Sequence, residues 1–314
     1  MRVVVTGGAG FIGANLCRRL ALESAIVEVV AFDDLSTGSR KNLEGVDPKI
    51  KLVVATLLDR DDVDATVDGA DAIVHLAARP SVPRSLADPV ATHRVNVDGT
   101  VNVLEAARGL SRSPRFVFAS SSSVYGANPT MPKTEDLVAQ PRSPYAASKL
   151  SGESYALAYQ ESFGLPVLAF RFFNVFGPLQ TPGHAYAAVV PAFIHAALLD
   201  EPLPVHGDGL QIRDFTFVDT VTDVITRAVL DGVTSPTPVN LAFGTRSTLL
   251  DVIAIIEQLL GKSVERNHLP VRAGDVRESQ ASNARLRQLF PDVSPVGLAE
   301  GLKATVAWMQ SVVV

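Results

Sequence analysis

The sequence predicts an α/β protein with a doubly wound, parallel sheet and a smaller C-terminal α/β region. Short apolar runs alternate with helical patterns through the first half of the chain, which is typical of a parallel sheet with right-handed crossovers. A glycine-rich turn separates the first run from the first helical pattern. Of the 314 residues 47% are apolar, which is enough for a large core.

Charge and hydropathy exclude several functional classes. The net charge is -5 and Lys and Arg form no cluster, which argues against a nucleic-acid surface or a polybasic membrane anchor. No apolar run approaches the ~20 residues of a transmembrane helix, and no charged and apolar leader precedes the first strand. We therefore expect a cytoplasmic protein. The single cysteine, Cys17, leaves no internal disulfide or multi-cysteine metal site, and we expect no metal.

The first element is a strand over residues 1–6 that runs into the turn from Gly7 to Gly13 and a helical pattern over 14–22. This order is typical of dinucleotide binding. Gly7 permits the tight turn, Gly10 lets the backbone approach a pyrophosphate, and Gly13 allows the helix to pack closely on the strand. The helix N-terminus then offers N–H groups to phosphates.

The second strand, residues 28–32, ends in Asp33, about 20 residues after the glycine turn, where a carboxylate binds the adenosine ribose. The same carboxylate would repel a 2′-phosphate, which favours NAD over NADP. The alternative for Asp33 is a solvated turn. Strands 50–54 and 72–76 and helices 59–67 and about 96–108 continue the alternation. Within them, His75 is interpreted as a core histidine rather than a ligand. Asn96 is either a helix-surface amide or a polar group that braces the active-site loop.

The next strand, 115–119, leads to four serines and then to a helix over 145–163. Ser143 suits the N-cap, Pro144 the first helical position, and Gly164 the stop. Tyr145 and Lys149 are four residues apart and share a helix face.

The end of strand 115–119 can bring the hydroxyl of Ser121 to the Tyr145 and Lys149 face. An isolated tyrosine has a pKa of about 10, and a neighbouring lysine cation favours the phenolate. The sequence therefore predicts Tyr145 as a catalytic base for a sugar hydroxyl, with Lys149 and Ser121 beside it. The alternative is an ordinary amphipathic pair.

The chain resembles the extended short-chain dehydrogenases/reductases of the NAD-dependent epimerase/dehydratase type, and within them most closely the UDP-hexose 4-epimerases. The resemblance extends from Met1 to at least Asp275. It rests on Thr6 to Gly13, Asp33, His75-Leu-Ala-Ala78, Asn96, Ser121 before Tyr125-Gly126, and Tyr145-x-x-x-Lys149. It implies a Rossmann domain that binds NAD through Gly7, Gly10, Phe11, Ile12, Gly13, Asp33, Leu57, Leu76, Ala77, Ala78, Asn96, Tyr145 and Lys149.

One position departs from the family pattern. The family places an aspartate that contacts adenine after the third strand, and this chain has Thr56 there. We expect adenine recognition to rest on Leu57 backbone groups and a weaker hydroxyl contact.

The second half of the chain is expected to bind a UDP-sugar. By resemblance, Asn174 contacts the diphosphate or sugar, the segments with Val189, Leu203 and Val205 cradle the uracil, and Arg213 and Arg272 with Asp275 bind phosphate and ribose. Ser122 and Ser123 are candidates to bind a substrate carboxylate. The expected domains are 1–177, with about 212–245 returning to it, and 178–211 with 246–314.

The resemblance implies 4-epimerisation of a UDP-hexose by oxidation at C4, turnover of the 4-keto sugar and return of the hydride. The UDP-glucose/UDP-galactose pair is the expected substrate. Ser279, where the family sometimes has a tyrosine, predicts a roomier pocket that admits UDP-N-acetylglucosamine.

Two alternatives remain. UDP-glucuronate 4-epimerases resemble the chain but carry Thr at Asn174 and Arg at Thr181. A 4,6-dehydratase or a sugar-acid decarboxylase is disfavoured because those families carry a carboxylate in the loop 121–126, which holds no Asp or Glu here. By analogy, the helices 95–107 and 145–163 would pair in a homodimer.

Overall fold

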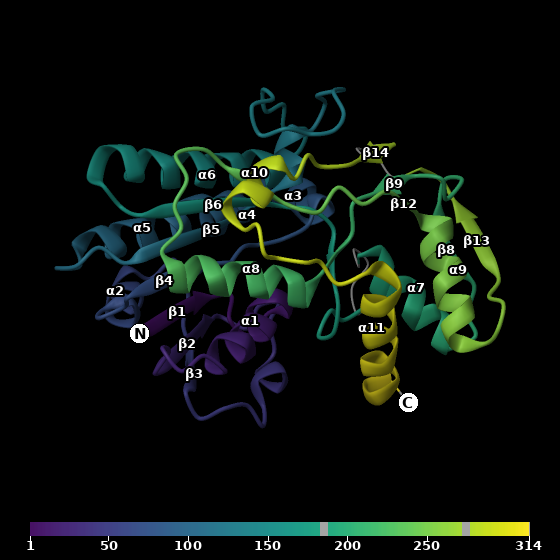
Figure 1. Cartoon of the computed structure of the whole chain (residues 1–314), viewed down its shortest axis with the longest axis horizontal. Helices are drawn as coiled ribbons and strands as arrows, with labels where there is room; N and C mark the ends of the chain where they lie inside the picture. Colours follow the sequence, from purple (N-terminus) through teal and green to yellow (C-terminus); the bar gives the residue numbers. More distant parts are fainter. Residues whose placement is uncertain (183–187, 272–276, 314) are drawn as a thin grey trace.

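The computed structural model describes residues 1–182, 188–271 and 277–313. Within these residues, the largest sheet has seven parallel strands in the order β11-β6-β5-β4-β1-β2-β3 (Figure 1). The reversal between β1 and β4 opens a crevice at the carboxyl ends of the strands, where ligands bind in such sheets. The strands are β1 (Arg2–Thr6), β2 (Glu28–Asp33), β3 (Ile50–Val54), β4 (Ala72–His75), β5 (Arg115–Ser121), β6 (Val167–Phe172) and β11 (Val239–Leu241).

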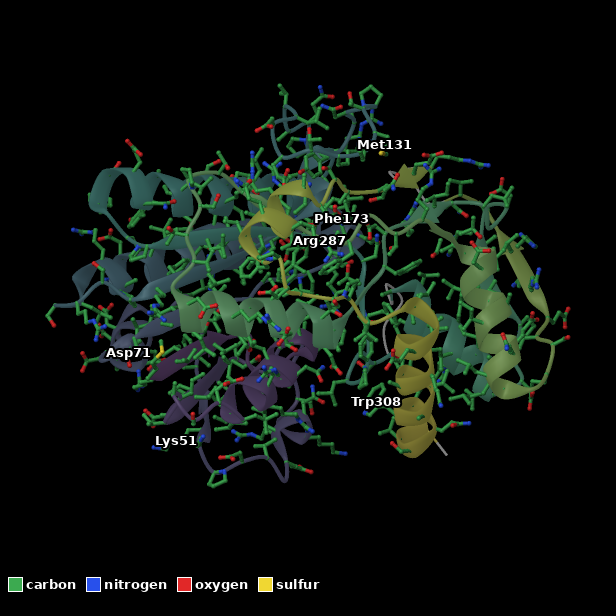
Figure 2. All side chains as sticks on the ribbon, viewed as in Figure 1. Lys51, Asp71, Met131, Phe173, Arg287 and Trp308 are labelled. Carbon is green, nitrogen blue, oxygen red and sulfur yellow. The ribbon has the colours of Figure 1, made fainter. Side chains whose placement is uncertain are left out.

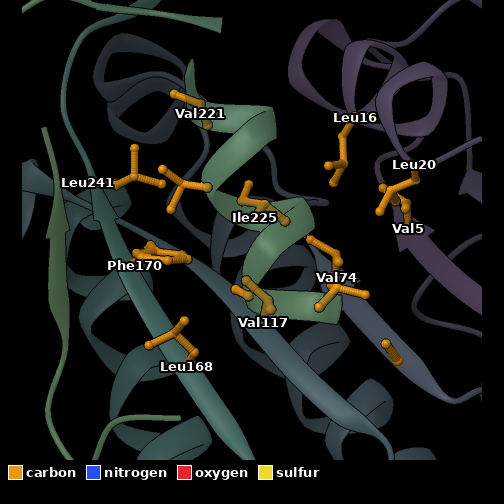
Figure 3. Packing of buried hydrophobic residues seen from close by; sticks show 14 of the residues in the cluster. Val5, Leu16, Leu20, Val74, Val117, Leu168, Phe170, Val221, Ile225 and Leu241 are labelled. Carbon is orange, nitrogen blue, oxygen red and sulfur yellow. The ribbon is translucent and has the colours of Figure 1, made fainter. Parts of the chain in front are cut away.

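Helices cover both faces of this sheet, which is why its central strands are apolar on both sides. On one face Val5, Val74 and Phe170 pack against Leu16 and Ile225 from two helices (Figure 3). That face is covered by α1 (Phe11–Ala21), α8 (Val218–Asp231) and α10 (Ala284–Leu289), and the other by α2 (Arg60–Val67), α5 (Gly99–Gly109) and α6 (Pro144–Phe163).

Local sequence signals set the ends of α6. The Ser143 hydroxyl accepts a hydrogen bond from the Ala146 amide at 3.1 Å, Pro144 occupies the first turn, and Gly164 ends the helix at φ 70°. The predicted caps are confirmed. In contrast, α1 begins at Phe11 rather than at residue 14, because the extended Gly10 serves directly as its N-cap.

The helix expected over 96–108 is part of a longer helical run. Asp88 caps the start of this run by accepting a hydrogen bond from the Ala91 amide at 2.9 Å. A π-helical turn interrupts the run, so α5 starts later than expected. Before α5 the run comprises α4 (Pro89–His93) and the π turn η2 (Arg94–Asp98), whereas α3 (Val82–Ala87) is a separate short helix that ends at Asp88. Single turns elsewhere are η1 (Arg40–Leu43) and η3 (Ser122–Tyr125).

A second apolar core lies beside the large sheet, on the right of Figure 1. Phe193, Leu203 and Ile253 are buried in it, and Trp308 packs against it from the C-terminal helix (Figure 2). Its elements are α7 (Val189–Leu198), β8 (Leu203–His206), α9 (Leu249–Leu260), β13 (Arg266–Leu269) and α11 (Leu298–Val313).

Short strands join the two cores. Strand β7 pairs with β10, and β9 lies between β12 and β14. They are β7 (Val175–Phe176), β9 (Ile212–Arg213), β10 (Thr216–Phe217), β12 (Ser247–Thr248) and β14 (Glu278–Ser279).

Residues near the C-terminus return to the large sheet. The Phe290 ring lies 6.1 Å from that of Phe170 on β6, and Leu286 and Val293 belong to the same core. The expected second domain, 178–211 with 246–314, is therefore interrupted by α10. Among the helices of the described residues, none combines the length and the apolar character needed to cross a bilayer.

Candidate active site

The turn between β1 and α1 leaves no room for side chains. Gly7 has a φ of +70°, and a Cβ there would lie 2.9 Å from the Ala77 amide nitrogen. A Cβ at Gly13 would lie 2.0 Å from the Gly7 carbonyl oxygen, so the first turn of α1 rests directly on this loop. Both positions require glycine, as the sequence analysis expects.

The N-terminus of α1 is open to an anion. Its N-cap, Gly10, provides no side-chain hydrogen bond, and the first turn contains no acidic residue. The first N–H groups of a helix have no partner within the helix and carry its positive dipole end. They are therefore available to phosphate oxygens.

A cavity of about 710 Å³ lies beside this turn, at the carboxyl ends of the strands. It is also lined by Ser36, Thr37, Arg79 and Gln180, which the sequence analysis did not assign. They lie in loops, where no periodicity shows which side chain turns inward. The predicted site residues that line it are Gly7, Gly10, Phe11, Ile12, Gly13, Asp33, Leu57, Leu76, Ala77, Ala78, Ser121, Ser122, Tyr145, Lys149 and Asn174.

Asp33 closes one side of the cavity at the end of β2. Its carboxylate accepts hydrogen bonds from the Leu35 amide at 2.8 Å and the Ala9 amide at 3.0 Å. Burial raises the pKa of the carboxyl, and the two amides oppose that shift. Each oxygen keeps capacity to accept a ribose hydroxyl.

Thr56 and Leu57 line the cavity beyond Asp33. The Thr56 hydroxyl accepts a hydrogen bond from the Leu58 amide at 3.3 Å, and the Leu57 carbonyl accepts one from the Asn102 side chain at 2.9 Å. These bonds fix the loop after β3 against α5.

His75 is a buried structural histidine, as predicted. Its Nδ1 lies 2.7 Å from the Thr6 hydroxyl and its Nε2 lies 2.9 Å from the Thr100 hydroxyl. Because Thr100 donates to the Asn96 carbonyl at 2.7 Å, it must accept from Nε2–H, so Nδ1 accepts from Thr6. Burial is the main cause that lowers the pKa of His75 to about 3.

The assignment of Asn96 to cofactor binding is corrected by the structure. The side chain is 2% exposed and does not line the cavity. Its Oδ1 accepts from the Arg79 amide at 2.6 Å, and its Nδ2 donates to the Ser148 hydroxyl at 2.9 Å. Because both ends of the carboxamide make these hydrogen bonds, Asn96 connects the loop after β4 to the start of α6.

Tyr145, in the first turn of α6, meets Ser121 at the end of β5. The Ser121 side chain lies close enough to the Tyr145 hydroxyl to lower the pKa of the phenol, whereas burial raises it by more. The Ser123 hydroxyl donates to the Ser121 oxygen at 2.9 Å. Because Ser121 accepts this bond, its own proton stays available for donation.

Lys149 is oriented differently from the expectation. Its ammonium, 6% exposed, donates to the Ala119 carbonyl at 2.8 Å and lies 5.5 Å from the Phe118 ring centre. Burial lowers the pKa of Lys149 to about 8. The lowering of the Tyr145 pKa comes from Ser121 instead. A buried ammonium needs an acceptor, and the end of β5 supplies it.

Glu153 lies beneath the site and was not among the residues predicted from the sequence. Its carboxylate accepts a hydrogen bond from Ser120 at 2.6 Å and pairs with Arg171 on β6. Glu153 lies four residues after Lys149 on the same helix face, a spacing that could have revealed it. It fixes the end of β5 next to Ser121.

A second cavity, of about 220 Å³, adjoins the first; Asn174, Val175 and Gln180 line both. Asn174 is exposed, and its Nδ2 donates to the Asp214 carbonyl at 3.2 Å. Val189 and Arg213 also line the second cavity.

Leu203 and Val205 do not line it, which corrects their assignment. Both have an exposed fraction of 0% and belong to the second core, whereas Pro204 and His206 face the cavity. Side chains alternate along a strand, so the neighbours of the buried residues form the wall.

Ser123 also departs from its assignment, because its hydroxyl supports Ser121 and the residue lines neither cavity. Arg272 and Asp275 lie outside the described residues.

NAD fits the larger cavity. Side chains are excluded where the pyrophosphate must approach, the α1 N-terminus is open, and Asp33 offers acceptors for a ribose. The two cavities adjoin each other at Asn174, Val175 and Gln180. Among the described residues, no group of three or more His, Cys, Asp or Glu side chains is arranged to hold a metal ion.

Comparison with known proteins agrees with this geometry. The family model for the NAD dependent epimerase/dehydratase family matches residues 3–242. The chain is 38% identical over 315 residues to a UDP-glucose 4-epimerase of Mycolicibacterium smegmatis, covering 99% of each chain.

Two solved structures are similar over nearly the whole chain. One is the UDP-N-acetylglucosamine 4-epimerase of Methanobrevibacter ruminantium M1 in complex with UDP-N-acetylmuramic acid, with a TM-score of 0.92, 35% identity and coverage of 99% and 98%. The other is the UDP-glucose 4-epimerase of Thermus thermophilus in complex with NAD, with a TM-score of 0.88, 33% identity and 99% coverage of both chains.

Proposed function

The chain belongs to the NAD dependent epimerase/dehydratase family, and we propose from this that it is an NAD-dependent 4-epimerase of UDP-hexoses. The substrate is UDP-glucose and UDP-galactose, or UDP-N-acetylglucosamine. The observation that carries the proposal is that Tyr145, Ser121 and Lys149 line the same cavity as the glycine turn and Asp33.

Each side chain has a distinct role in the proposed reaction. NAD, when bound, supplies the acceptor for the hydride of C4 and returns it to the opposite face of the ring. Tyr145 takes the proton of the C4 hydroxyl and later gives it back. Ser121 donates a hydrogen bond to the oxygen on which negative charge develops. Lys149, whose buried ammonium donates to the Ala119 carbonyl, lines the same cavity and supplies a positive charge there.

The second cavity is proposed to hold the nucleotide. Arg213 suits the diphosphate, because a guanidinium makes paired, charge-assisted hydrogen bonds to phosphate oxygens. Asn174, which lines both cavities, is placed to contact the diphosphate or the sugar. The predicted roles of Arg272 and Asp275 remain predictions.

Product analysis in deuterated water tests the reaction. Purified protein is incubated without added NAD with UDP-glucose, UDP-N-acetylglucosamine or UDP-glucuronate. We expect inverted C4 without solvent deuterium for one of the first two sugars. Inversion of UDP-glucuronate alone would favour the glucuronate 4-epimerase alternative. A 4-keto-6-deoxy product would instead identify a dehydratase.

The base role is tested with Tyr145→Phe. Removing the hydroxyl should lower turnover by about 10²–10⁴-fold while NAD stays bound. Tyr155→Phe, which changes an exposed tyrosine on the same helix, is the control and should keep wild-type turnover. Substantial turnover by Tyr145→Phe would remove Tyr145 from the base role.

We also propose a homodimer formed through α5 and α6. Tyr155 on α6 is 44% exposed and Val90 on the neighbouring α4 is 67% exposed, so apolar surface is left uncovered there. Tyr155→Glu should yield monomers in size exclusion with light scattering, whereas Val27→Glu, at an exposed valine elsewhere, should not. Dimers of Tyr155→Glu would contradict this interface. The cytoplasmic location also stays a prediction.

A further inference from the structure

Asp214 is a buried carboxylate that directly follows the cavity residue Arg213. Its exposed fraction is 0%, and one of its oxygens accepts hydrogen bonds from the Gly244 amide at 3.0 Å and the Ala281 amide at 3.2 Å. The other oxygen accepts from the Thr245 amide at 3.2 Å and the Thr245 hydroxyl at 2.9 Å. These four donors are neutral groups. An apolar side chain would avoid the cost of burying this charge, so the carboxylate is explained by what it holds in place.

The donors flank the small sheet that carries Arg213. Strand β9 lies between β12 and β14, and Arg213 is in register with Ser247 on one side and Ser279 on the other. Thr245 stands two residues before Ser247, and Ala281 stands two residues after Ser279. The carboxylate therefore ties both neighbouring strands to the Arg213 end of β9. Strands this short make few ladder hydrogen bonds, so the tie contributes strongly to their register.

The main chain of Asp214 also holds Asn174. The Asp214 carbonyl accepts from the Asn174 Nδ2 at 3.2 Å, and the Asn174 carbonyl accepts from the Thr216 amide at 3.2 Å. Asn174 lines both cavities, and Arg213 lines the second. One buried residue thus connects the two segments whose side chains are proposed to meet the diphosphate.

We infer that Asp214 is a positioning residue, whose buried carboxylate fixes β9 so that the Arg213 guanidinium meets the diphosphate of the UDP-sugar. This rests on the proposed role of Arg213. A guanidinium makes paired hydrogen bonds to phosphate only in a matched geometry, so a shift of β9 weakens these bonds without removing the charge. Asp214→Asn replaces one acceptor oxygen with an NH₂ group, which faces at least one backbone amide that also donates.

A double-mutant cycle on UDP affinity tests this role. UDP is titrated calorimetrically into the NAD-bound wild type, Arg213→Met, Asp214→Asn and the double variant. Arg213→Met should weaken UDP binding about tenfold or more, and Asp214→Asn should weaken it about tenfold. In the Arg213→Met background, Asp214→Asn should change the affinity by less than about threefold, because the group through which it acts is gone.

Kinetics and a matched variant separate positioning from a general loss of stability. In Asp214→Asn the KM for the UDP-sugar should rise about tenfold, while kcat stays within about threefold of the wild type. Glu153→Gln alters another buried carboxylate, which lines neither cavity, and should leave the UDP affinity within about threefold of the wild type. A loss of UDP affinity in Glu153→Gln as large as that in Asp214→Asn would overturn the positioning role.

Thr245→Val decides the question if Asp214→Asn does not fold. It removes the hydroxyl donor and keeps the amides, so it should weaken UDP binding about threefold, and only when Arg213 is present.

Equal losses of UDP affinity with and without Arg213 would overturn the role of Asp214 and leave the epimerase proposal intact. Unchanged UDP affinity in Arg213→Met or in Asp214→Asn would do the same. Absence of both UDP binding and epimerisation in the wild type would overturn the proposed function, and this inference with it.

Discussion

The carboxylate of Glu153 receives two hydrogen bonds from the guanidinium of Arg171, at 2.7 and 3.0 Å, and the two residues are only 3% and 4% exposed. The pair joins α6 to β6 beneath the active site. Arg171 also lies 4.7 Å from the Tyr125 ring, and Tyr125 donates to Asn240 on β11 at 2.6 Å. Removal of either charge would leave the other buried without compensation.

Glu153→Ala should therefore lower the free energy of unfolding by about 3–5 kcal/mol. The substitution leaves the buried Arg171 charge without its carboxylate partner and the Ser120 hydroxyl without its acceptor. Urea unfolding measures this change. Glu161→Ala, at an exposed position of the same helix, should shift stability by less than about 0.5 kcal/mol. Equal effects of the two substitutions would show that the buried pair contributes little.

His75 should make stability depend on pH. Its pKa is lowered from 6.5 to about 3 in the folded protein, so the unfolded chain binds a proton first as pH falls. The contribution of His75 to the free energy of unfolding is complete above pH 6.5, its pKa in the unfolded chain. It is lost as the pH falls from there toward about 3, its pKa in the folded protein, at about 1.4 kcal/mol per pH unit. His75→Gln should remove this part of the pH dependence of the free energy of unfolding, which is measured by denaturant unfolding at several pH values between 6.5 and about 3. Identical slopes for both proteins would rule out His75 as a source.

Ser121 should set the pH at which Tyr145 acts. Burial raises the pKa of Tyr145 and the nearby Ser121 side chain lowers it, so the active phenolate accumulates as pH rises. Ser121→Ala should move the alkaline midpoint of kcat to higher pH and lower kcat at neutral pH by at least about tenfold. Ser151→Ala, at a partly exposed serine of α6 that lines neither cavity, is the control. A loss of kcat without a shift of the midpoint would leave Ser121 no role in tuning Tyr145.

Gly13 should be intolerant of any side chain. Gly13→Ala places a Cβ 2.0 Å from the Gly7 carbonyl and must displace the glycine turn. We expect about 1–3 kcal/mol of destabilisation and a loss of NAD from the purified protein. The NAD content and thermal unfolding of Gly109→Ala, where a Cβ meets no atom within 4 Å, should match the wild type. Full NAD occupancy in Gly13→Ala would show that a side chain at this position does not displace the glycine turn.

Much of the fold was predictable because its signals are local. The strands and the caps of α6 follow from apolar runs and from Ser143 and Gly164, whose preferences act over a few residues. The positions of Asp33 and Tyr145 were also predictable, because a residue at the end of a strand or in the first turn of a helix is positioned by that element.

The sequence alone determined which elements form and which of their ends meet at the sheet edge. Only the tertiary structure decided where polar side chains point. Lys149 turns to Ala119, Asn96 to Arg79, and Glu153 to Arg171, because a buried charge or amide must find its partner among residues distant in the sequence. Such partners are brought together by packing, and no local pattern encodes them.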